Sequence, residues 1–211
     1  MLPSILPIFP LPATVLFPKI FLPLHIFEPR YREMVADALA GDHMIGVVLL
    51  KKGWERDYES APPIYPIGCA GLITHAEPLE GGRYNIVLQG LERFRVAAEE
   101  EGRSYRRARI EPLFESVDAP AREALGRERS RIEDLLDPPL EAIGLDPKYY
   151  RSMPDEDLVN ALSQYLDFDP LEKQALLACD GALHRARSLI DLLEMRKLLQ
   201  KSAWNRTMRA Q

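Results

Sequence analysis

The sequence predicts an α+β fold in which a small β-barrel or sandwich precedes a helical bundle. Residues 1–116 hold short apolar runs separated by turn signals, a pattern typical of small barrels and sandwiches. From residue 117 onward, apolar residues instead recur every three or four positions, as along the buried face of a helix. We therefore expect a mostly β subdomain at residues 1–116, a helical subdomain at 117–205 and a tail at 206–211.

The first 30 residues contain seven prolines but are otherwise strongly apolar. Proline is excluded from helix interiors and central strands, so this segment is predicted to be extended chain with short strands, packed on a core. The residues expected to fill that core are Phe9, Leu16, Phe17, Phe27 and Tyr31. A short helix is predicted next, from Glu28 or Pro29 to Leu39, and Gly41 closes it.

Further strands are predicted at residues 45–50, 67–75, 84–89, 94–98 and 106–114. Gly68 and Gly71 interrupt the second of these runs and indicate a bulge or a close backbone approach. Residues 80–83 form a predicted hairpin turn. Residues 51–66 are predicted to be a long loop.

The second half contains several helical stripes. One includes Leu125 and Ile132, and another comprises Leu158, Val159, Leu162, Tyr165 and Leu166. Asp169 and Glu172 form a predicted capping box with proline at the first helical position. After Gly181 a last helix carries a stripe of Leu183, Ala186, Ile190 and Leu193.

The composition excludes several classes of protein. The chain has 27 basic and 32 acidic residues, a net charge of −5, which is unlike a strongly basic nucleic-acid binder. Its two cysteines form no CxxC pair, so neither a disulfide framework nor a zinc ribbon is expected. No apolar run is long enough to span a membrane, and no segment resembles a secretory signal. We expect a cytoplasmic protein.

The sequence assigns no catalytic residue, metal site or cofactor. None of its lysines follows a glycine, which excludes the phosphate-binding loop of a Walker site. The four histidines form no HExxH motif or close pair. Residues 102–106 only approach a nucleophile elbow, because the second glycine is missing. Because the residues of a catalytic triad can be scattered along a chain, an unrecognised hydrolase remains an alternative.

Residues 103–109 interleave arginines with Tyr105, a pattern that could contact phosphate and stack on a base. The other interpretation is an edge strand whose solvated arginines prevent unwanted pairing. The net negative charge favours the edge strand, and RNA binding stays a second alternative.

The opening residues resemble the Lon protease amino-terminal domain family. The motifs are Leu-Pro-Ile-Phe-Pro-Leu-Pro at residues 6–12, Val-Leu-Phe-Pro at 15–18 and the stretch from 22 to 34, which contains His-Ile-Phe-Glu-Pro-Arg-Tyr. Residues 45–48, 68–70, 82–84, 88–96 and 172–177 continue the likeness. The resemblance implies a PUA-like β pseudo-barrel followed by a C-terminal helical bundle, and a role in recognising protein substrates for degradation. Because the 211 residues hold no ATPase or serine–lysine protease domain, a stand-alone homologue is expected.

We therefore expect a non-catalytic protein-binding module that recognises unfolded or client polypeptides, acting with a separate protease. Adaptable apolar surface suits such partners better than a deep polar pocket. The candidate binding residues are in the 51–66 loop: Trp54, Tyr58, Ile64 and Tyr65. Tryptophan and tyrosine are favoured interface anchors, although the same aromatics could simply pack the loop onto the barrel.

Overall fold

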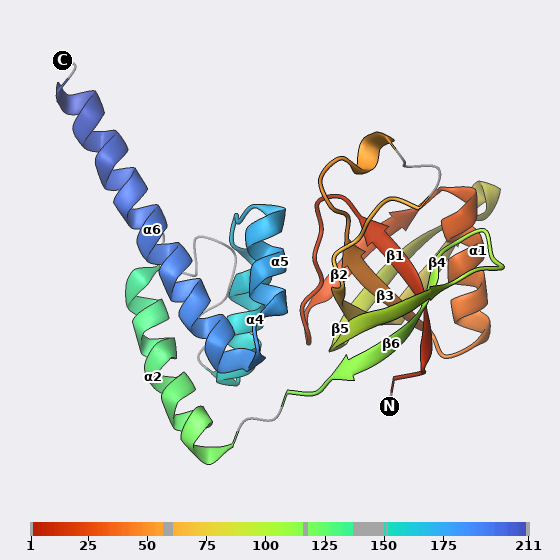
Figure 1. Ribbon diagram of the computed structural model, residues 1–211, viewed down its shortest axis with the longest axis horizontal. Coiled ribbons are helices and arrows are strands. Elements are labelled where there is room, and N and C mark those ends of the chain that lie inside the picture. Colours follow the sequence, from red (N-terminus) through yellow and green to blue (C-terminus); the bar gives the residue numbers. More distant parts are fainter. Residues whose placement is uncertain (1, 57–60, 116–117, 137–149, 151, 210–211) are drawn as a thin grey trace. The chain divides into compact units, whose positions relative to one another are not determined.

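The computed structural model describes residues 2–56, 61–115, 118–136, 150 and 152–209, and for residues 56, 200 and 202–209 the backbone alone. The chain forms two compact units. The barrel unit comprises Met1–Phe114 with Phe168–Ala178, and the helical unit comprises Glu115–Asp167 with Cys179–Gln211. A six-stranded mixed sheet and a helical C-terminal region confirm the predicted α+β class (Figure 1).

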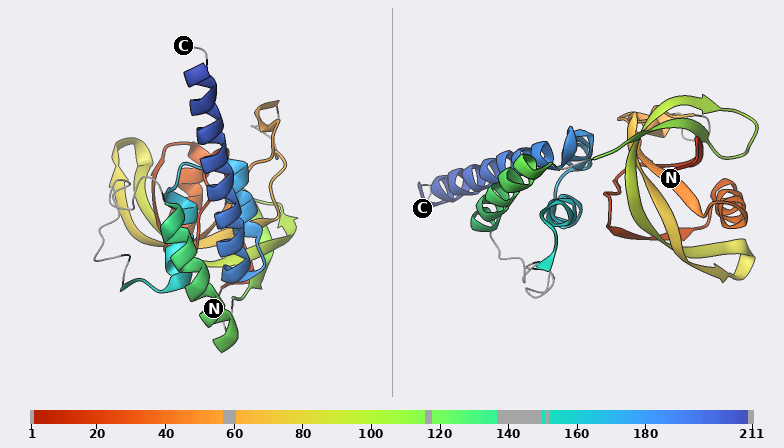
Figure 2. Two further views of the ribbon diagram at one scale, coloured as in Figure 1. Left: turned by 90° about the vertical axis from the view of Figure 1, so that its left-hand side faces the viewer. Right: turned by 90° about the horizontal axis from the view of Figure 1, so that it is seen from below.

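The strands of the barrel unit curl around a closed ring (Figure 2). They are β1 (Ile5–Leu11), β2 (Phe21–Ile26), β3 (Met44–Leu49), β4 (Ile67–Leu79), β5 (Arg83–Glu100) and β6 (Arg107–Leu113). Their order is β2-β5-β4-β3-β1-β6, and an additional β5–β6 pairing closes the ring. β1 and β3 are parallel, and the other pairs are antiparallel.

Strand β5 is a single strand of 18 residues where the sequence predicted two. Its first half pairs with β2 and its last half with β6, while β4 runs along both halves. The predicted hairpin turn before it is confirmed as a short 3₁₀ turn, η2 (Glu80–Gly82). Gly81 lies there at φ 73°, in the left-handed region that glycine adopts without strain.

The barrel interior requires a close backbone approach at Gly68, as predicted. A β-carbon at that position would lie 2.5 Å from the carbonyl oxygen of Val47 and 2.9 Å from the Phe94 ring. The absent side chain thus leaves room for Phe94. The core cluster around this ring consists of Leu6, Ile8, Val48, Ala70, Phe94, Ala108 and Ile110.

Helix α1 (Pro29–Ala40) confirms the predicted helix. It starts with proline at its first position and ends at Ala40, with Gly41 as its C-cap. Its buried residues, Tyr31, Met34, Val35 and Ala38, recur at helical spacing and form one packed face. Tyr31 lies against Phe9, with ring centroids 4.5 Å apart.

Polar contacts join α1 to the turn between β5 and β6. The Tyr105 hydroxyl donates to Asp37 Oδ2 at 2.7 Å, and the Ser104 hydroxyl donates to Glu33 Oε2 at 2.7 Å. Burial, followed by the hydrogen bond to Asp37, raises the pKa of Tyr105 to about 12. The fold therefore favours the protonated phenol.

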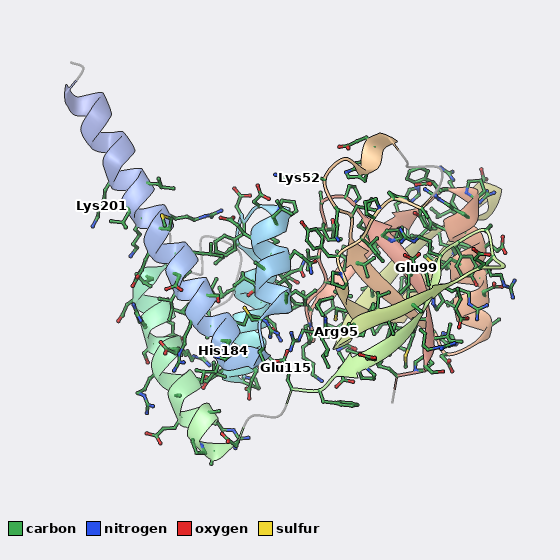
Figure 3. The ribbon with its side chains drawn as sticks, viewed as in Figure 1. Lys52, Arg95, Glu99, Glu115, His184 and Lys201 are labelled. Atoms are coloured by element: carbon green, nitrogen blue, oxygen red, sulfur yellow. The ribbon has the colours of Figure 1, made fainter. Side chains whose placement is uncertain are left out.

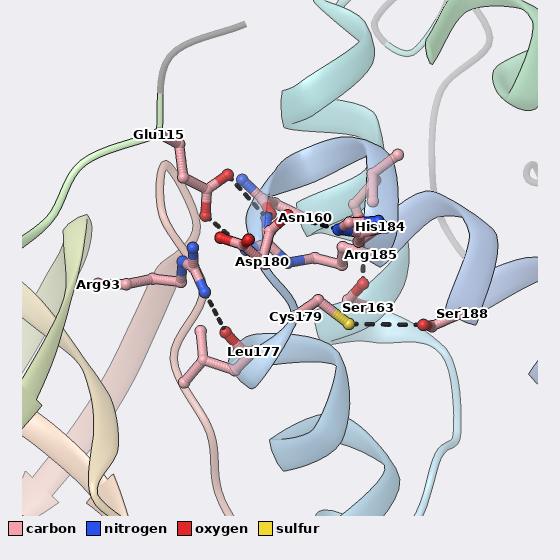
Figure 4. Close-up of polar contacts among 11 residues, drawn as sticks. Arg93, Glu115, Asn160, Ser163, Leu177, Cys179, Asp180, His184, Arg185 and Ser188 are labelled. Atoms are coloured by element: carbon pink, nitrogen blue, oxygen red, sulfur yellow. Dashed lines mark hydrogen bonds and ion pairs between the residues drawn. The ribbon is translucent and has the colours of Figure 1, made fainter. Parts of the chain in front are cut away.

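Helix α5 (Pro170–Ala178) belongs to the barrel unit, although helices flank it in the sequence. The predicted capping box is present: the Asp169 amide donates to Glu172 Oε2 at 2.8 Å, and the Leu171 amide donates to Asp169 Oδ1. Two side-chain contacts hold α5 to the sheet. Gln174 Nε2 donates to the Ile67 carbonyl oxygen at 3.0 Å, and Arg93 donates to the Leu177 carbonyl oxygen at 2.8 Å (Figure 4).

The helical unit contains α2 (Ala119–Leu135), α4 (Asp155–Tyr165) and α6 (Gly181–Arg209). Asp118 caps α2 by accepting a hydrogen bond from the Ala121 amide at 2.8 Å. The predicted α4 stripe is buried at Leu158, Val159 and Leu162, but Tyr165 is 51% exposed. The expectation that Tyr165 is core was wrong, because α4 ends at that residue and its last turn leaves the packed face.

Arg185 is the largest fully buried side chain of the chain's described residues. Its guanidinium donates to Glu115 Oε1 at 2.6 Å and to Asn160 Oδ1 at 2.7 Å (Figure 4). A buried charge needs such partners, since an unpaired one would carry a large desolvation cost. The contact ties α6 to α4 and to the first residue of the helical unit.

Leu162→Ala should destabilise the helical unit by about 2–5 kcal/mol, because it removes a fully buried side chain and leaves a cavity. Denaturant unfolding followed by far-UV circular dichroism measures the loss. Tyr165→Ala on the same helix is the matched control and should have little effect. An unchanged midpoint for Leu162→Ala would contradict the packing described for α4.

The raised pKa of the Tyr105 hydroxyl predicts that the protein loses folding stability at alkaline pH. Its folded pKa lies above the ordinary value of 10.0, so the stabilisation is complete below pH 10 and is lost as the pH rises toward 12. The melting temperature, measured at intervals through this pH window, should therefore fall more steeply for the native protein than for Tyr105→Phe. Parallel pH curves for the two proteins would contradict the assignment.

Candidate protein-binding surface

Strand β2 is the one described strand of the barrel unit with a single strand neighbour. It pairs with β5 alone, from Phe21 opposite Gln89 to Ile26 opposite Tyr84. Every other described strand pairs with at least two. Pro23 is tolerated there because an edge strand leaves some backbone amides without a ladder partner. The outer edge and one face of β2 are therefore open to solvent.

The exposed face of β2 is apolar and aromatic. Side chains alternate along the strand, so Leu22, Leu24 and Ile26 turn inward while Phe21, Pro23 and His25 are exposed. Phe21 is 50% exposed, and Phe27, which continues the alternation just beyond the strand, is 61% exposed. We call Phe21, Pro23 and Phe27 the β2 surface. No residue from Phe21 to Phe27 carries a fixed charge.

Neighbouring polar groups hold part of the β2 surface in place. The His25 ring stacks on Phe27, with centroids 6.1 Å apart and planes 22° from parallel. His25 Nδ1 also lies 2.8 Å from Asn85 Oδ1, and Asn85 donates to Glu77 Oε2 at 3.0 Å. This chain of contacts crosses β2, β5 and β4. It orders the aromatic ring of Phe27 without burying it.

The prediction that Phe27 belongs to the core was wrong, whereas Phe9, Leu16, Phe17 and Tyr31 are buried as expected. An apolar residue on a strand is buried only if another layer covers its face. The sequence pattern does not reveal which strand lies at an edge. A signal was nevertheless present, since an uncharged aromatic strand containing proline is typical of an edge.

The structure distributes the four residues proposed from the sequence over separate environments. Trp54 begins a short 3₁₀ turn, η1 (Trp54–Arg56), and is partly buried. Ile64 pairs with Leu50 and packs against the core cluster. Tyr65 is also partly buried, and Lys51 Nζ lies 5.8 Å from its ring centroid. Tyr58 lies outside the described residues, so it is placed with none of them.

The arginines of residues 103–109 are paired with acidic side chains. Arg106 Nε donates to Glu99 at 2.7 Å, and Arg107 and Arg109 lie 3.7 and 3.4 Å from Glu100 oxygens (Figure 3 labels Glu99). Tyr105 is buried and bonded to Asp37, so its ring is not presented for stacking. The interpretation of this motif as an edge strand is wrong, because β6, which begins at Arg107, pairs with both β1 and β5. The arginines are held in ion pairs with glutamates, which does not favour a phosphate-binding surface either.

A cavity of about 470 Å³ lies beside the turn between β5 and β6. Ser104 lines it together with Arg30, Tyr31 and the three glutamates at 99–101. Its described lining residues include no histidine, and the Ser104 hydroxyl donates its hydrogen bond to Glu33. Within the described ranges, no group of three histidine, cysteine or acidic side chains is placed to hold a metal ion. Likewise, none of the described helices is both long and apolar enough to cross a membrane.

Comparison with known proteins identifies relatives of the same fold. The family model of the ATP-dependent protease La (LON) substrate-binding domain matches residues 5–195. Lon protease 2 of Myxococcus xanthus is 28% identical over 205 residues, which cover 95% of this chain and 24% of that protein. Lon protease of Syntrophus aciditrophicus is 34% identical over 114 residues, covering 53% of this chain and 14% of that protein. The chain thus spans at most about a quarter of the length of these relatives.

Two solved structures show the same architecture. The N-terminal domain of the Mycobacterium avium complex Lon protease superposes with a TM-score of 0.71 at 16% identity, covering 90% of this chain and 98% of that one. The Lon N-terminal domain protein from Xanthomonas campestris gives 0.61 at 23% identity, covering 89% and 98%. Both likenesses confirm the fold, and the PUA-like barrel predicted from the opening motifs is consistent with them. The family match over residues 5–195 goes further than fold: this chain belongs to the LON substrate-binding domain family.

Proposed function

We propose that the chain is a non-catalytic module that binds unfolded or other client polypeptides through the β2 surface and presents them to a separate protease. The observation that carries the proposal is the exposed, uncharged aromatic face of an edge strand. Membership of a substrate-binding domain family supports the same function.

The chemistry of the β2 surface suits an unfolded client. Unfolded chains expose apolar and aromatic side chains that a folded protein buries, and burial of apolar area is favourable irrespective of sequence. Phe21 and Phe27 offer this area on a strand whose backbone is already paired with β5. Little conformational entropy is lost on binding, because a phenylalanine has only two side-chain torsions and Phe27 is also stacked on His25.

The residues proposed from the sequence form a second candidate contact. Trp54 is only partly buried, and the charged residues around it, such as Lys51, Lys52 and Glu55, are exposed. This supports Trp54 as an anchor that remains in contact with solvent, and Tyr58 is proposed with it from the sequence alone. Ile64 and Tyr65 are proposed as the base of the same contact, because the first packs on the core and the second is half buried.

Phe21→Ser combined with Phe27→Ser should weaken the binding of a permanently unfolded client, such as reduced and carboxymethylated α-lactalbumin, by about 10- to 100-fold. That range corresponds to roughly 0.7–1.4 kcal/mol for each ring whose exposed area is buried. Fluorescence anisotropy of the labelled client measures the affinity, and electrophoresis should show the client uncleaved. Phe114→Ser is the matched control, because Phe114 is 74% exposed but lies outside β2.

An equal loss of affinity in the Phe114→Ser control would show that exposed phenylalanine contributes without regard to position. Unchanged affinity in the folded double variant would remove β2 from the binding site. Thermal unfolding must accompany both measurements, since only variants with native stability report on binding.

Trp54→Ala combined with Tyr58→Ala should weaken the same client several-fold to about thirty-fold if the loop is a contact. The expected result is lower affinity at unchanged melting temperature. A lower melting temperature with a proportionate loss of binding would instead assign these aromatics to packing of the loop. Unchanged affinity in a stable variant would exclude the loop from the binding surface.

A further inference from the structure

The outer edge of β2 carries backbone groups that take no part in the sheet. In an antiparallel ladder every second residue turns its amide and carbonyl group toward the partner strand, and the residues between turn theirs away. The Gly90 amide of β5 donates to the carbonyl oxygen of Ile20, the residue before β2, at 2.8 Å, which fixes this alternation. Counting from that bond, the residues of β2 that turn away from β5 are Phe21, Pro23 and His25.

Pro23 agrees with this phase, because a proline has no amide hydrogen and cannot donate to β5. The outer edge therefore presents two amides, of Phe21 and His25, and three carbonyl groups, of Phe21, Pro23 and His25. No residue in the described part of the chain forms a hydrogen bond with these five groups. They are spaced by two residues along one line, as the pairing groups of a sheet edge are.

The edge has few of the features that usually prevent strand pairing. Natural edge strands are protected by charged side chains, by bulges or by a covering segment. β2 has no fixed charge from Phe21 to Phe27, and its register with β5 is continuous over all six residues. Pro23 removes one donor but leaves its carbonyl oxygen as an acceptor. The outer edge is therefore able to pair with an extended chain.

We propose that a client polypeptide binds as an additional strand along the outer edge of β2. This inference rests on the proposed function and specifies how the client is held. The client backbone accepts hydrogen bonds from the Phe21 and His25 amides and donates to the carbonyl groups of the edge. On one face its side chains lie beside Phe21 and His25, and on the other face beside Leu22 and Leu24, which are partly buried.

This geometry defines the class of client. A segment of about five residues in extended conformation spans the edge from Phe21 to His25. Its backbone supplies the same hydrogen bonds whatever its sequence, so recognition is broad. Charged side chains are disfavoured opposite the apolar residues of β2, and prolines are disfavoured at the residues that donate. Folded proteins are excluded, since their backbone groups are already paired.

A second copy of β2 fits the edge less well than a client. It would bring its own Pro23, so two donors would be missing from the new ladder where a proline-free client leaves one missing. Pro23 thus disfavours pairing of the protein with itself while permitting most of the hydrogen bonds to a foreign strand.

Hydrogen exchange of the ¹⁵N-labelled full chain, followed by NMR, tests the backbone directly. In the free protein the Phe21 and His25 amides should exchange fast, and those of Leu22 and Leu24 slowly, because only the latter donate to β5. Saturation with reduced and carboxymethylated α-lactalbumin should slow exchange at Phe21 and His25 at least about tenfold. Leu22 and Leu24 are internal controls. Unchanged exchange at Phe21 and His25 in the saturated complex would overturn the proposal.

A modified peptide tests the client side. The blocked peptide Lys-Thr-Val-Phe-Val-Thr-Lys should displace labelled α-lactalbumin. The same peptide with N-methyl groups on its five central residues keeps every side chain but loses the donors, so it should displace the client at least about tenfold less effectively. Equal displacement by the two peptides, or none by the unmodified one, would contradict strand addition.

His25→Pro removes one outward donor of the edge without breaking the ladder to β5, and His25→Ala is its matched control because alanine keeps the amide. With circular dichroism unchanged, His25→Pro should bind the unmodified peptide roughly threefold or more weakly than His25→Ala. Equal affinities of the two variants would speak against the proposal.

These measurements separate the inference from the proposed function. If Phe21→Ser combined with Phe27→Ser weakens client binding while the Phe21 and His25 amides of the native complex exchange as in the free protein, strand addition fails and the β2 surface remains the site. If that double variant binds normally, both fail. Slow exchange of the same amides in concentrated protein without client would assign the edge to a second copy and overturn the inference.

Discussion

At Gly90 the backbone of β5 comes so close to another segment that a β-carbon would lie 2.1 Å from the Phe17 carbonyl oxygen. Two backbone hydrogen bonds fix this crossing: the Lys19 amide donates to the Gly90 carbonyl oxygen, and the Gly90 amide donates to Ile20, both at 2.8 Å. The crossing lies where β5 leaves β2 and continues toward β6. Closure of the barrel and the position of the β2 surface both depend on this one residue having no side chain.

Features with local causes could be predicted from the sequence. Pro29 and Gly41 bound α1, Asp169 and Glu172 cap α5, and Gly68 allows a close approach, because each acts on backbone atoms a few residues away or on a position that only glycine fits. Two strands were predicted where the structure has the single strand β5, and Gly90 lies between the two predicted runs. In the structure it is an interior residue of β5, opposite Gly71.

Features with distant causes could not be predicted in the same way. Phe27 is exposed because no other layer covers the outer face of β2, which is a property of the fold and not of the strand. α5 reads as one more amphipathic helix, yet Gln174 and Arg93 attach it to the sheet through partners 107 and 84 residues away. Arg185 looks like a surface residue in sequence, and its hydrogen bonds to Glu115 and Asn160 help to explain its complete burial. A buried ion pair is weak evidence for stability, because the desolvation of the two charges offsets much of their attraction.

The order of strands in the barrel unit has a consequence for synthesis on the ribosome. β1 pairs with β6 through Ile5 opposite Arg109. More than 100 further residues must therefore be synthesised before the hydrogen bonds between β1 and β6 can form. α5 follows only after α2 and α4 have emerged. Contacts of such sequence separation slow folding, because the entropy of loop closure is lost before they form. During this interval the apolar N-terminal strands lack part of their pairing and expose apolar side chains, so the nascent chain itself is a candidate for chaperone binding.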